Sequence, residues 1–304
     1  MERLRDSKAV FARYEALRSR LPEFPDGRDR PPIVVDDLSA AFDRFDVFVL
    51  DGFGVLNVGG AAIEGAAQRV AEMRAAGKRV IVLTNSATFP TIAGVSKYRG
   101  LGFDFDASEI VSSRDVAETA MAQMPQGLVW GATAAGPASI ADLSAHALED
   151  AGQPYEAADA FLYLSGDEWN EARQARLVEA LKARPRRVVV ANPDLVAPRE
   201  TGLTTEPGAW AHALLDELPS LDLSFHGKPL ANAFDAVMER LGPNAPPSAR
   251  IAMVGDTLHT DILGGAAAGW GTILVTAHGI LKGLDPNPFI DASGIVPDIV
   301  AHTT

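Results

Sequence analysis

Reactive and charged side chains stand just after several hydrophobic segments of this sequence. Asp51 closes an uninterrupted run, Val-Phe-Val-Leu, which is typical of a parallel strand buried on both faces. Thr84 closes a second run, Lys228 follows a shorter one, and Gly-Asp-Thr-Leu-His-Thr-Asp at 255–261 follows a fourth. Open α/β sheets bind their ligands at the carboxyl ends of their strands. We therefore expect these residues to converge on one site.

Each of these residue types suits one part of a reaction at a phosphoryl group. Asp51 could act as a nucleophile that forms an aspartyl intermediate. Thr84 offers a hydroxyl and a backbone amide to a phosphoryl oxygen, and Lys228 supplies positive charge to the transition state. Asp256 and Asp261 provide hard oxygen ligands of the kind that Mg²⁺ takes. The metal would neutralise charge between two anions that otherwise repel each other.

The elements that must position these residues alternate between strands and helices. In the first third of the chain, the pattern predicts strands at 47–50, 79–83 and 109–112 and helices at 64–76 and 92–99. In the last third it predicts a helix at 232–241 and strands at 250–254 and 271–275. Such alternation predicts an α/β fold with a doubly wound, Rossmann-like parallel sheet and right-handed crossovers.

A second, smaller α/β pattern interrupts this one, with strands expected at 128–130, 160–164 and 187–191. The sequence therefore predicts a core domain from residues 35–125 and 207–304, with a domain inserted at 126–206. Residues 1–34 form an N-terminal extension. Hydrophobic side chains at helical spacing there predict an amphipathic helix, packed on the core or on a partner subunit.

Composition excludes several classes of function. The net charge of −13 argues against a nucleic-acid partner, because no basic patch could dominate the field. The chain has no cysteine, which rules out disulfides, thiolate metal sites and cysteine nucleophiles. No hydrophobic run approaches the length of a membrane span, and the first thirty residues lack the pattern of a signal peptide. We therefore expect a cytoplasmic protein without a membrane partner.

Five motifs in a fixed order resemble those of the haloacid dehalogenase (HAD) superfamily, specifically its class IIA, NagD-like group. The resemblance covers about residues 45–285. It rests on Asp51-x-x-Gly54-Val55-Leu56, Leu83-Thr84-Asn85, Ala191-Asn192-Pro193-Asp194, Gly227-Lys228-Pro229 and Gly255-Asp256-x-x-x-Thr260-Asp261-Ile262. It implies a Rossmann-like core with a C2-type cap inserted after the second motif. The sequence agrees, because the short segment after Leu56 leaves no room for a cap earlier.

One position departs from the family pattern. In HAD phosphatases, the residue two after the nucleophile is normally a second Asp, which protonates the leaving oxygen and then activates water. Here that residue is Phe53, which can do neither. The resemblance implies that this position binds the metal through its backbone carbonyl, which Phe53 retains. A class IIA subgroup with Trp at this position is similar.

Three interpretations of Phe53 stay open. The protein could hydrolyse phosphates with good leaving groups, His259 or a residue of the inserted domain could replace the missing acid, or the protein could bind a phosphorylated ligand with little turnover. Dehalogenases also lack the second Asp, but the carboxylates at 256 and 261 argue against that chemistry. Phosphonatases use a Schiff-base lysine, whereas Lys182, the lysine of the insert, lies among arginines typical of a solvated helix end.

The sequence thus predicts a Mg²⁺-dependent hydrolase of a small phosphorylated metabolite, acting through an aspartyl-phosphate. The alternative is a catalytically weak phosphate-ligand binding or regulatory module on the same fold. Asp51 and Lys228 are the expected catalytic residues, with Thr84, Asn85 and Lys228 binding the phosphoryl group. The expected metal ligands are Asp51, Phe53, Asp256 and Asp261. A homodimer could form through the N-terminal helix or the cap.

Overall fold

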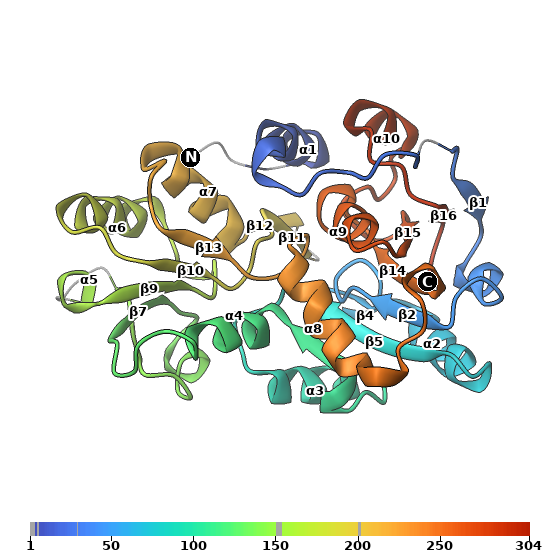
Figure 1. Ribbon diagram of the computed structural model, residues 1–304, viewed down its shortest axis with the longest axis horizontal. Helices are drawn as coiled ribbons and strands as arrows, with labels where there is room; N and C mark the ends of the chain where they lie inside the picture. The colour runs from blue at the N-terminus through green and yellow to red at the C-terminus, as the bar shows by residue number, and fades with distance from the viewer. Residues whose placement is uncertain (1–3, 5, 29, 150–153, 200–201) are drawn as a thin grey trace.

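The structure is a computed structural model that describes residues 4, 6–28, 30–149, 154–199 and 202–304. Two α/β domains lie side by side, the larger made from both ends of the chain and the smaller from its middle (Figure 1). We call them the core and the cap. The expected fold class, an α/β core with an inserted α/β domain, is confirmed.

Within the described residues, the core contains a seven-stranded parallel sheet with the order β1-β16-β15-β14-β2-β5-β6. Its strands are β1 (Ile33–Val35), β2 (Val47–Leu50), β5 (Arg79–Thr84), β6 (Ile110–Ser112), β14 (Ile251–Gly255), β15 (Gly271–Val275) and β16 (Ile299–Ala301). From β2 the chain adds β5 and β6 on one side, whereas β14 to β16 fill the other. The order therefore reverses between β2 and β14, where open α/β sheets bind ligands.

Helices cover both faces of this sheet, which explains the uninterrupted hydrophobic run before Asp51. Phe48 and Leu50 face α2 and α3, whereas Val47 and Val49 face α4 and α8. The helices of the core are α2 (Ala66–Ala75), α3 (Thr91–Gly100), α4 (Ser113–Met121), α8 (Ala231–Leu241), α9 (Leu263–Ala267) and α10 (Asn287–Ser293).

The cap holds a second parallel sheet with the order β13-β10-β9-β7-β8. Its strands are β7 (Trp130–Thr133), β8 (Ala145–Ala147), β9 (Ala160–Tyr163), β10 (Val188–Val190) and β13 (Leu223–Phe225), and its helices are α5 (Pro154–Ala157), α6 (Glu171–Ala183) and α7 (Pro207–Glu217). One face packs on α6 and α7. The other packs on the core, where Ala132 and Leu162 share a hydrophobic cluster with Ala117 of α4.

Two antiparallel hairpins and several short helical turns complete the fold. Both hairpins line the cavity described below: β3 (Asn57–Val58) with β4 (Ala61–Ala62), and β11 (Val196–Arg199) with β12 (Gly202–Thr205). The turns are 3₁₀ helices at Arg18–Arg20, Leu38–Ala41, Ala107–Glu109, Pro137–Ser139, Gly242–Asn244 and Ser248–Arg250, and a π-helical turn at Leu258–Ile262.

The return from the cap to the core lies later in the chain than the sequence division at 206/207. The division assigned 207–304 to the core, but β13 pairs with β10 of the cap sheet, and α7 packs on the cap face through Trp210 and Leu214. Sequence pattern alone does not show which sheet a short strand joins. We therefore propose that the cap continues to about residue 226, just before Lys228.

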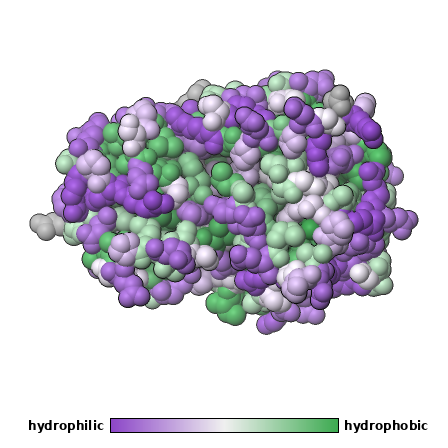
Figure 2. Space-filling view, in the orientation of Figure 1, coloured by the Kyte–Doolittle hydropathy of each residue, from purple (hydrophilic) through white to green (hydrophobic). Residues whose placement is uncertain are grey.

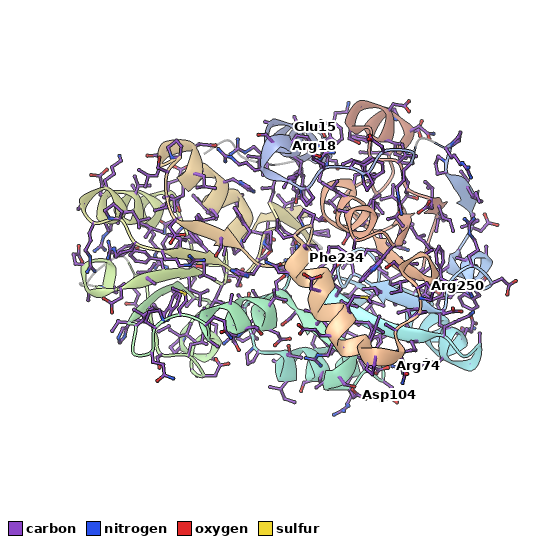
Figure 3. The ribbon with its side chains drawn as sticks, viewed as in Figure 1. Glu15, Arg18, Arg74, Asp104, Phe234 and Arg250 are labelled. Carbon is purple, nitrogen blue, oxygen red and sulfur yellow. The ribbon has the colours of Figure 1, made fainter. Side chains whose placement is uncertain are left out.

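The N-terminal helix α1 (Ser7–Ala16) contacts both domains. The hydroxyl of Tyr14 accepts a hydrogen bond from the backbone N–H of Leu195 in the cap (3.3 Å). On the core side, Glu15, visible on α1 in Figure 3, lies 2.6 Å from Nε2 of His259. The described helix is shorter than the segment expected to be amphipathic, and it joins the cap to the core as well as packing on the core.

The surface in the view of Figure 2 is hydrophilic over most of its outline, and hydrophobic side chains show towards the middle, between the domains. No helix among the described residues has both the length and the apolar character that a membrane crossing requires.

The buried His212 of α7 predicts acid lability of the cap. Its ring stacks on Phe225 (centroids 4.5 Å apart), and burial lowers the pKa of His212 to about 3. In the unfolded chain, His212 takes up a proton near pH 6.5, whereas in the folded chain it stays neutral there. The folded state is therefore destabilised relative to the unfolded state as pH falls below about 6.5. When the pH is lowered from 7 to 5, we expect the unfolding free energy of His212→Phe to fall by about 1–2 kcal/mol less than that of the wild type. Urea denaturation at the two pH values measures this difference.

The exposed His146 supplies the control. His146→Gln also removes one imidazole and should leave the wild-type pH slope unchanged. An equal slope in wild type and His212→Phe would show that His212 does not contribute to the acid lability.

Candidate active site

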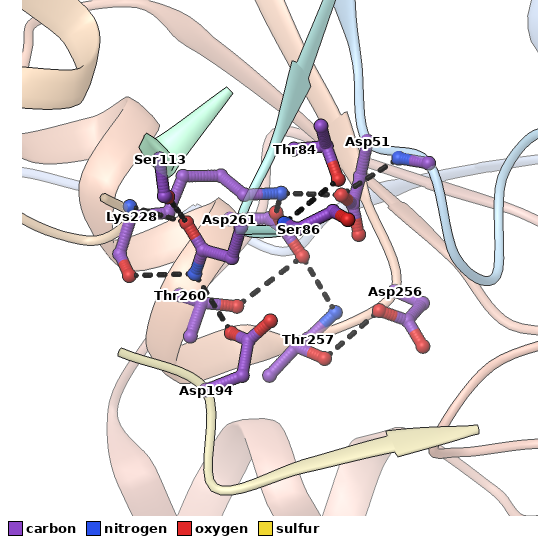
Figure 4. A network of polar contacts seen from close by, with 12 residues as sticks. Asp51, Thr84, Ser86, Ser113, Asp194, Lys228, Asp256, Thr257, Thr260 and Asp261 are labelled. Carbon is purple, nitrogen blue, oxygen red and sulfur yellow. Dashed lines mark hydrogen bonds and ion pairs between the residues drawn. The ribbon is translucent and has the colours of Figure 1, made fainter. Parts of the chain in front are cut away.

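Three of the strand-end residues predicted from the sequence, Asp51, Thr84 and Asp256, line one cavity of about 290 Å³ between the core and the cap. Lys228 and Asp261 join them through contacts with Asp51 and with each other (Figure 4). Asp51 follows β2, Thr84 ends β5, and Asp256 follows β14, so the switch point of the core sheet brings them together. Lys228 arrives from the other domain, three residues after β13 of the cap sheet ends. Asp261 lies in the π-helical turn that follows Asp256.

Lys228 forms a buried ion cluster with two carboxylates. Its Nζ lies 2.6 Å from Oδ1 of Asp51 and 2.7 Å from Oδ1 of Asp261. Lys228 is only 2% exposed and Asp261 is fully buried. The backbone N–H of Gly52 also donates to Oδ1 of Asp51 (2.7 Å), whereas no described residue is recorded as donating to Oδ2. The cluster therefore fixes the Asp51 carboxylate through one oxygen and leaves the other for a reactant.

The excess of carboxylates over lysine shifts the pKa values of this cluster. Burial raises the pKa of Asp51 to about 6, against the opposing charge of Lys228. Burial, together with the charges of Asp261 and Asp51, raises the pKa of Asp256 to about 7. Burial alone would lower the pKa of Lys228, but its carboxylate neighbours outweigh that effect and raise it. Lys228 is therefore a permanent cation, while the carboxylates repel one another.

Asn85 fixes the position of Lys228 through the backbone. Its side-chain oxygen accepts hydrogen bonds from the backbone N–H of Lys228 (2.8 Å) and from Oγ of Ser113 (2.8 Å), and its Nδ2 donates to the carbonyl of Lys228 (2.9 Å). Gly227 has φ +130°, and a Cβ there would clash with Ser113 and Asn85. Asn85 also lines the cavity, and its role at the phosphoryl group stays a prediction.

Three carboxylates could hold a divalent cation. Asp51, Asp256 and Asp261 each offer one oxygen, and these oxygens lie within 4.8 Å of one another. Asp256 is oriented by hydrogen bonds from the backbone N–H of Ile280 (2.8 Å) and from the hydroxyl of Thr257 (2.9 Å). A set of buried hard oxygen donors with uncompensated negative charge fits Mg²⁺ or a similar cation.

Phe53 lines the cavity, and two cations lie close to its ring. Nζ of Lys97, on α3 of the core, lies 4.5 Å from the ring centroid, and Cζ of Arg199, on β11 of the cap, lies 4.9 Å from it. Burial and the charge of Arg199 lower the pKa of Lys97 to about 8. The role of the Phe53 carbonyl as a metal ligand stays a prediction. No motif or spacing in the sequence distinguishes Lys97 from any other lysine on an exposed helix face.

The cap also contributes Asp194, the last residue of the motif at 191–194. This segment forms a turn, in which the side chain of Asn192 accepts a hydrogen bond from the backbone N–H of Asp194 (2.9 Å). In addition, the Asp194 carboxylate accepts a hydrogen bond from Nδ2 of Asn85 (2.8 Å) and lines the cavity (Figure 4). Burial raises the pKa of Asp194 well above its usual value.

Two residues considered from the sequence lie away from this cavity. His259 stacks on Tyr14 (centroids 4.9 Å apart) and faces Glu15 of α1, so it is not placed to replace a missing acid. Lys182 is half exposed and pairs with Glu179 (3.1 Å), as expected for a solvated helix end.

Two family models match the chain, one described as haloacid dehalogenase-like hydrolase over residues 48–143 and one described as HAD-hydrolase-like over residues 225–292. Between them they contain all the strand-end residues of the site.

Individual relatives cover most of the chain. Glycerol-3-phosphate phosphatase of Gallus gallus is 29% identical, over 85% of this chain and 89% of its own. A structure from Cytophaga hutchinsonii, described as a possible sugar phosphatase of the HAD superfamily, is similar with a TM-score of 0.79 at 23% identity, over 89% of this chain and 98% of its own. Glycerol phosphate phosphatase of Mycobacterium tuberculosis in complex with magnesium gives 0.67 at 22% identity, over 86% and 76%. Both structural likenesses establish the fold.

The repulsion among the three carboxylates predicts a response to metal that depends on Asp256. At pH 8 and a Mg²⁺ concentration of a hundred times Kd, we expect the metal to raise the unfolding free energy of the wild type by about 2.7 kcal/mol. The melting temperature should rise accordingly. Asp256→Asn removes one ligand and one repelling charge. It should therefore be at least as stable as wild type in EDTA and should lose most of the Mg²⁺ response.

Asp167, an exposed carboxylate on the same cavity, provides the matched control. Asp167→Asn should retain the full response in differential scanning fluorimetry. If both variants respond to Mg²⁺ as the wild type does, the metal does not bind at the buried carboxylates.

Proposed function

The chain belongs to the haloacid dehalogenase-like hydrolases, in their class IIA group, and from this premise we propose that it is a Mg²⁺-dependent phosphatase of a small phosphorylated metabolite. The observation that carries the proposal is the buried contact of 2.6 Å between Lys228 and Asp51, because Asp51 also belongs to the carboxylate cluster that could hold a metal ion. The glycerol-3-phosphate phosphatase from Gallus gallus supports a phosphorylated small molecule as the substrate class.

In the first step, we place Oδ2 of Asp51 as the attacking atom, because Oδ1 is held by Lys228 and Gly52. The bond from Oδ2 to phosphorus forms as the bond from phosphorus to the leaving oxygen breaks, which gives an aspartyl-phosphate and an alkoxide or phenoxide. In the second step, water attacks phosphorus, the carboxylate of Asp51 is released, and one proton of the water goes in net to the departed oxygen. The products are an alcohol and inorganic phosphate.

The surrounding residues bind charge that develops on the phosphoryl group. Lys228 stabilises the equatorial oxygens and the Asp51 carboxylate together, and Thr84 binds a phosphoryl oxygen at the end of β5. Asp51, Asp256 and Asp261 would hold Mg²⁺, with the Phe53 carbonyl as a further ligand. When bound, Mg²⁺ supplies positive charge between the carboxylate and the phosphoryl group.

Phe53 limits which phosphates the site can cleave efficiently. No proton donor stands at this position, and general acid–base assistance contributes about 10²–10⁴-fold in rate. Aryl and acyl phosphates release a stable anion and need little assistance, whereas sugar and glycerol phosphates need it. The alternative function is a phosphate-ligand binding module with little turnover, which the same residue favours.

Phosphate release separates the two functions. With Mg²⁺, we expect wild type to hydrolyse p-nitrophenyl phosphate and acetyl phosphate, and to act on glycerol 3-phosphate at least about 10²-fold more slowly. Asp51→Asn removes the nucleophile with little change in shape and should abolish release of phosphate from every substrate. Binding of inorganic phosphate without any turnover by the wild type would instead establish the binding module.

Restoring the acid tests the role of Phe53. Phe53→Asp should raise kcat/KM for glycerol 3-phosphate by about 10²–10⁴-fold and change p-nitrophenyl phosphate hydrolysis much less. Phe53→Asn introduces a side chain of nearly the same size as Asp but without the acid, and it should give no such gain. Equal values in the two variants would mean that the missing acid is not what limits turnover.

A further inference from the structure

Two cations from different domains meet at the part of the cavity occupied by Phe53. Lys97 comes from α3 of the core and Arg199 from β11 of the cap, and both lie within 5 Å of the same ring centroid. All three residues line the cavity that also contains Asp51. Neither cation belongs to the cluster of Lys228, Asp51 and the metal-type carboxylates, so the charges here need a separate explanation.

These two cations have few acidic partners; the charge of Asp51 acts on Lys97, but the two side chains form no ion pair. Lys97 makes no hydrogen bond or ion pair with another residue in the described part of the chain; its recorded contacts are with the rings of Phe53 and Tyr98. Arg199 donates to the hydroxyl of Thr204 (3.3 Å), and its one acidic contact within the described residues is a long one with Glu206 (3.5 Å). Two like charges close together in a partly buried place repel each other, and an anion between them would remove that repulsion.

Two of the nearby carboxylates accept shorter hydrogen bonds from other donors. Glu206 accepts hydrogen bonds from the hydroxyl of Thr204 (2.9 Å) and from Nδ2 of Asn192 (3.1 Å). Asp194 accepts a hydrogen bond from Nδ2 of Asn85 (2.8 Å). Asp167 is exposed. None of these acids is recorded as pairing with Lys97, so the space beside it is open to an anion from outside.

We propose that Lys97 and Arg199 form a second anion subsite, so that the substrate is a small phosphorylated metabolite with a further anionic group, either a carboxylate or a second phosphate. The phosphoryl group lies at Asp51, and the second anion lies between the two cations along the edge of Phe53. This inference rests on the proposed function and names its substrate class. Phe53 then serves as a platform that holds both cations through its ring face.

The size of the cavity agrees with this class. About 290 Å³ lies at the lower end of small-molecule sites and suits a phosphorylated acid of a few carbon atoms. Because the subsite is shared between α3 and the β11–β12 hairpin, it is complete only when the cap and core lie as they do here.

A matched pair of ligands tests the subsite. Glycerol 3-phosphate and 3-phosphoglycerate differ mainly at the far end, which is a hydroxymethyl group in the first and a carboxylate in the second. Propane-1,3-diol bisphosphate carries a phosphate there and distinguishes the two kinds of second anion. We expect the doubly anionic ligands to bind Asp51→Asn, measured by calorimetry with Mg²⁺, at least about tenfold more tightly than glycerol 3-phosphate, as charge-assisted hydrogen bonds predict.

Variants of the two cations should remove this preference specifically. In the Asp51→Asn background, Lys97→Met and Arg199→Met should each reduce the ratio of the two affinities by about tenfold, and Lys97→Arg should largely retain it. Lys182→Met removes a half-exposed lysine of the cap and should leave the ratio unchanged. Because the readout is a ratio between two ligands, a general loss of folded protein does not imitate the expected result.

The outcomes also separate this inference from the proposed function. Hydrolysis of p-nitrophenyl phosphate by the wild type, with equal affinities for the members of the pair, would overturn the subsite and leave the phosphatase intact. A preference for the second anion that depends on Lys97 and Arg199, without turnover of any phosphate, would support the subsite and overturn the phosphatase. A preference that both methionine variants retain would place the second anion elsewhere and overturn the subsite.

Discussion

The rest of the site depends on one buried cation, Lys228, held between Asp51 and Asp261. Burying two carboxylates is unfavourable unless positive charge accompanies them, and one lysine cannot neutralise the third carboxylate, Asp256. The cluster is therefore left with negative charge that a divalent cation can balance. The same lysine fixes one oxygen of Asp51 and, in the proposed reaction, also offers charge to an incoming phosphoryl group.

The position of Lys228 in turn depends on how the two domains meet. The residue lies where the chain returns from the cap, and Asn85 of the core binds both its backbone N–H and its carbonyl. Asn85 also binds Asp194 of the cap, so one amide connects the lysine, the core and the cap. The helix α1 adds a further connection, because Tyr14 contacts the cap while Glu15 contacts the core. The geometry of the cluster therefore depends on the position of the cap relative to the core.

Features of the site that depend on local sequence pattern could be predicted from the sequence. Asp51 and Asp256 were identified because each ends a hydrophobic run, and the ends of neighbouring parallel strands must lie together. The sequence could not predict that β13 joins the cap sheet, since pairing of a three-residue strand depends on distant residues. Nor could it identify Lys97 and Arg199, whose chemistry arises only when helix α3 and a cap hairpin come together at one ring. Contacts between domains leave no periodic signal.

Phe53 is the point where these considerations combine. Phe53 cannot transfer a proton as a carboxylic acid at this position would, and this difference alone suggests a loss of catalytic function. In the structure, however, its ring lies beside two cations that an Asp at this position would partly neutralise. An acid there would therefore compete with any anionic group of the substrate for Lys97 and Arg199. An aromatic residue here leaves those charges available, so the proposed weaker acid catalysis and the proposed recognition of a second anion have the same cause, Phe53.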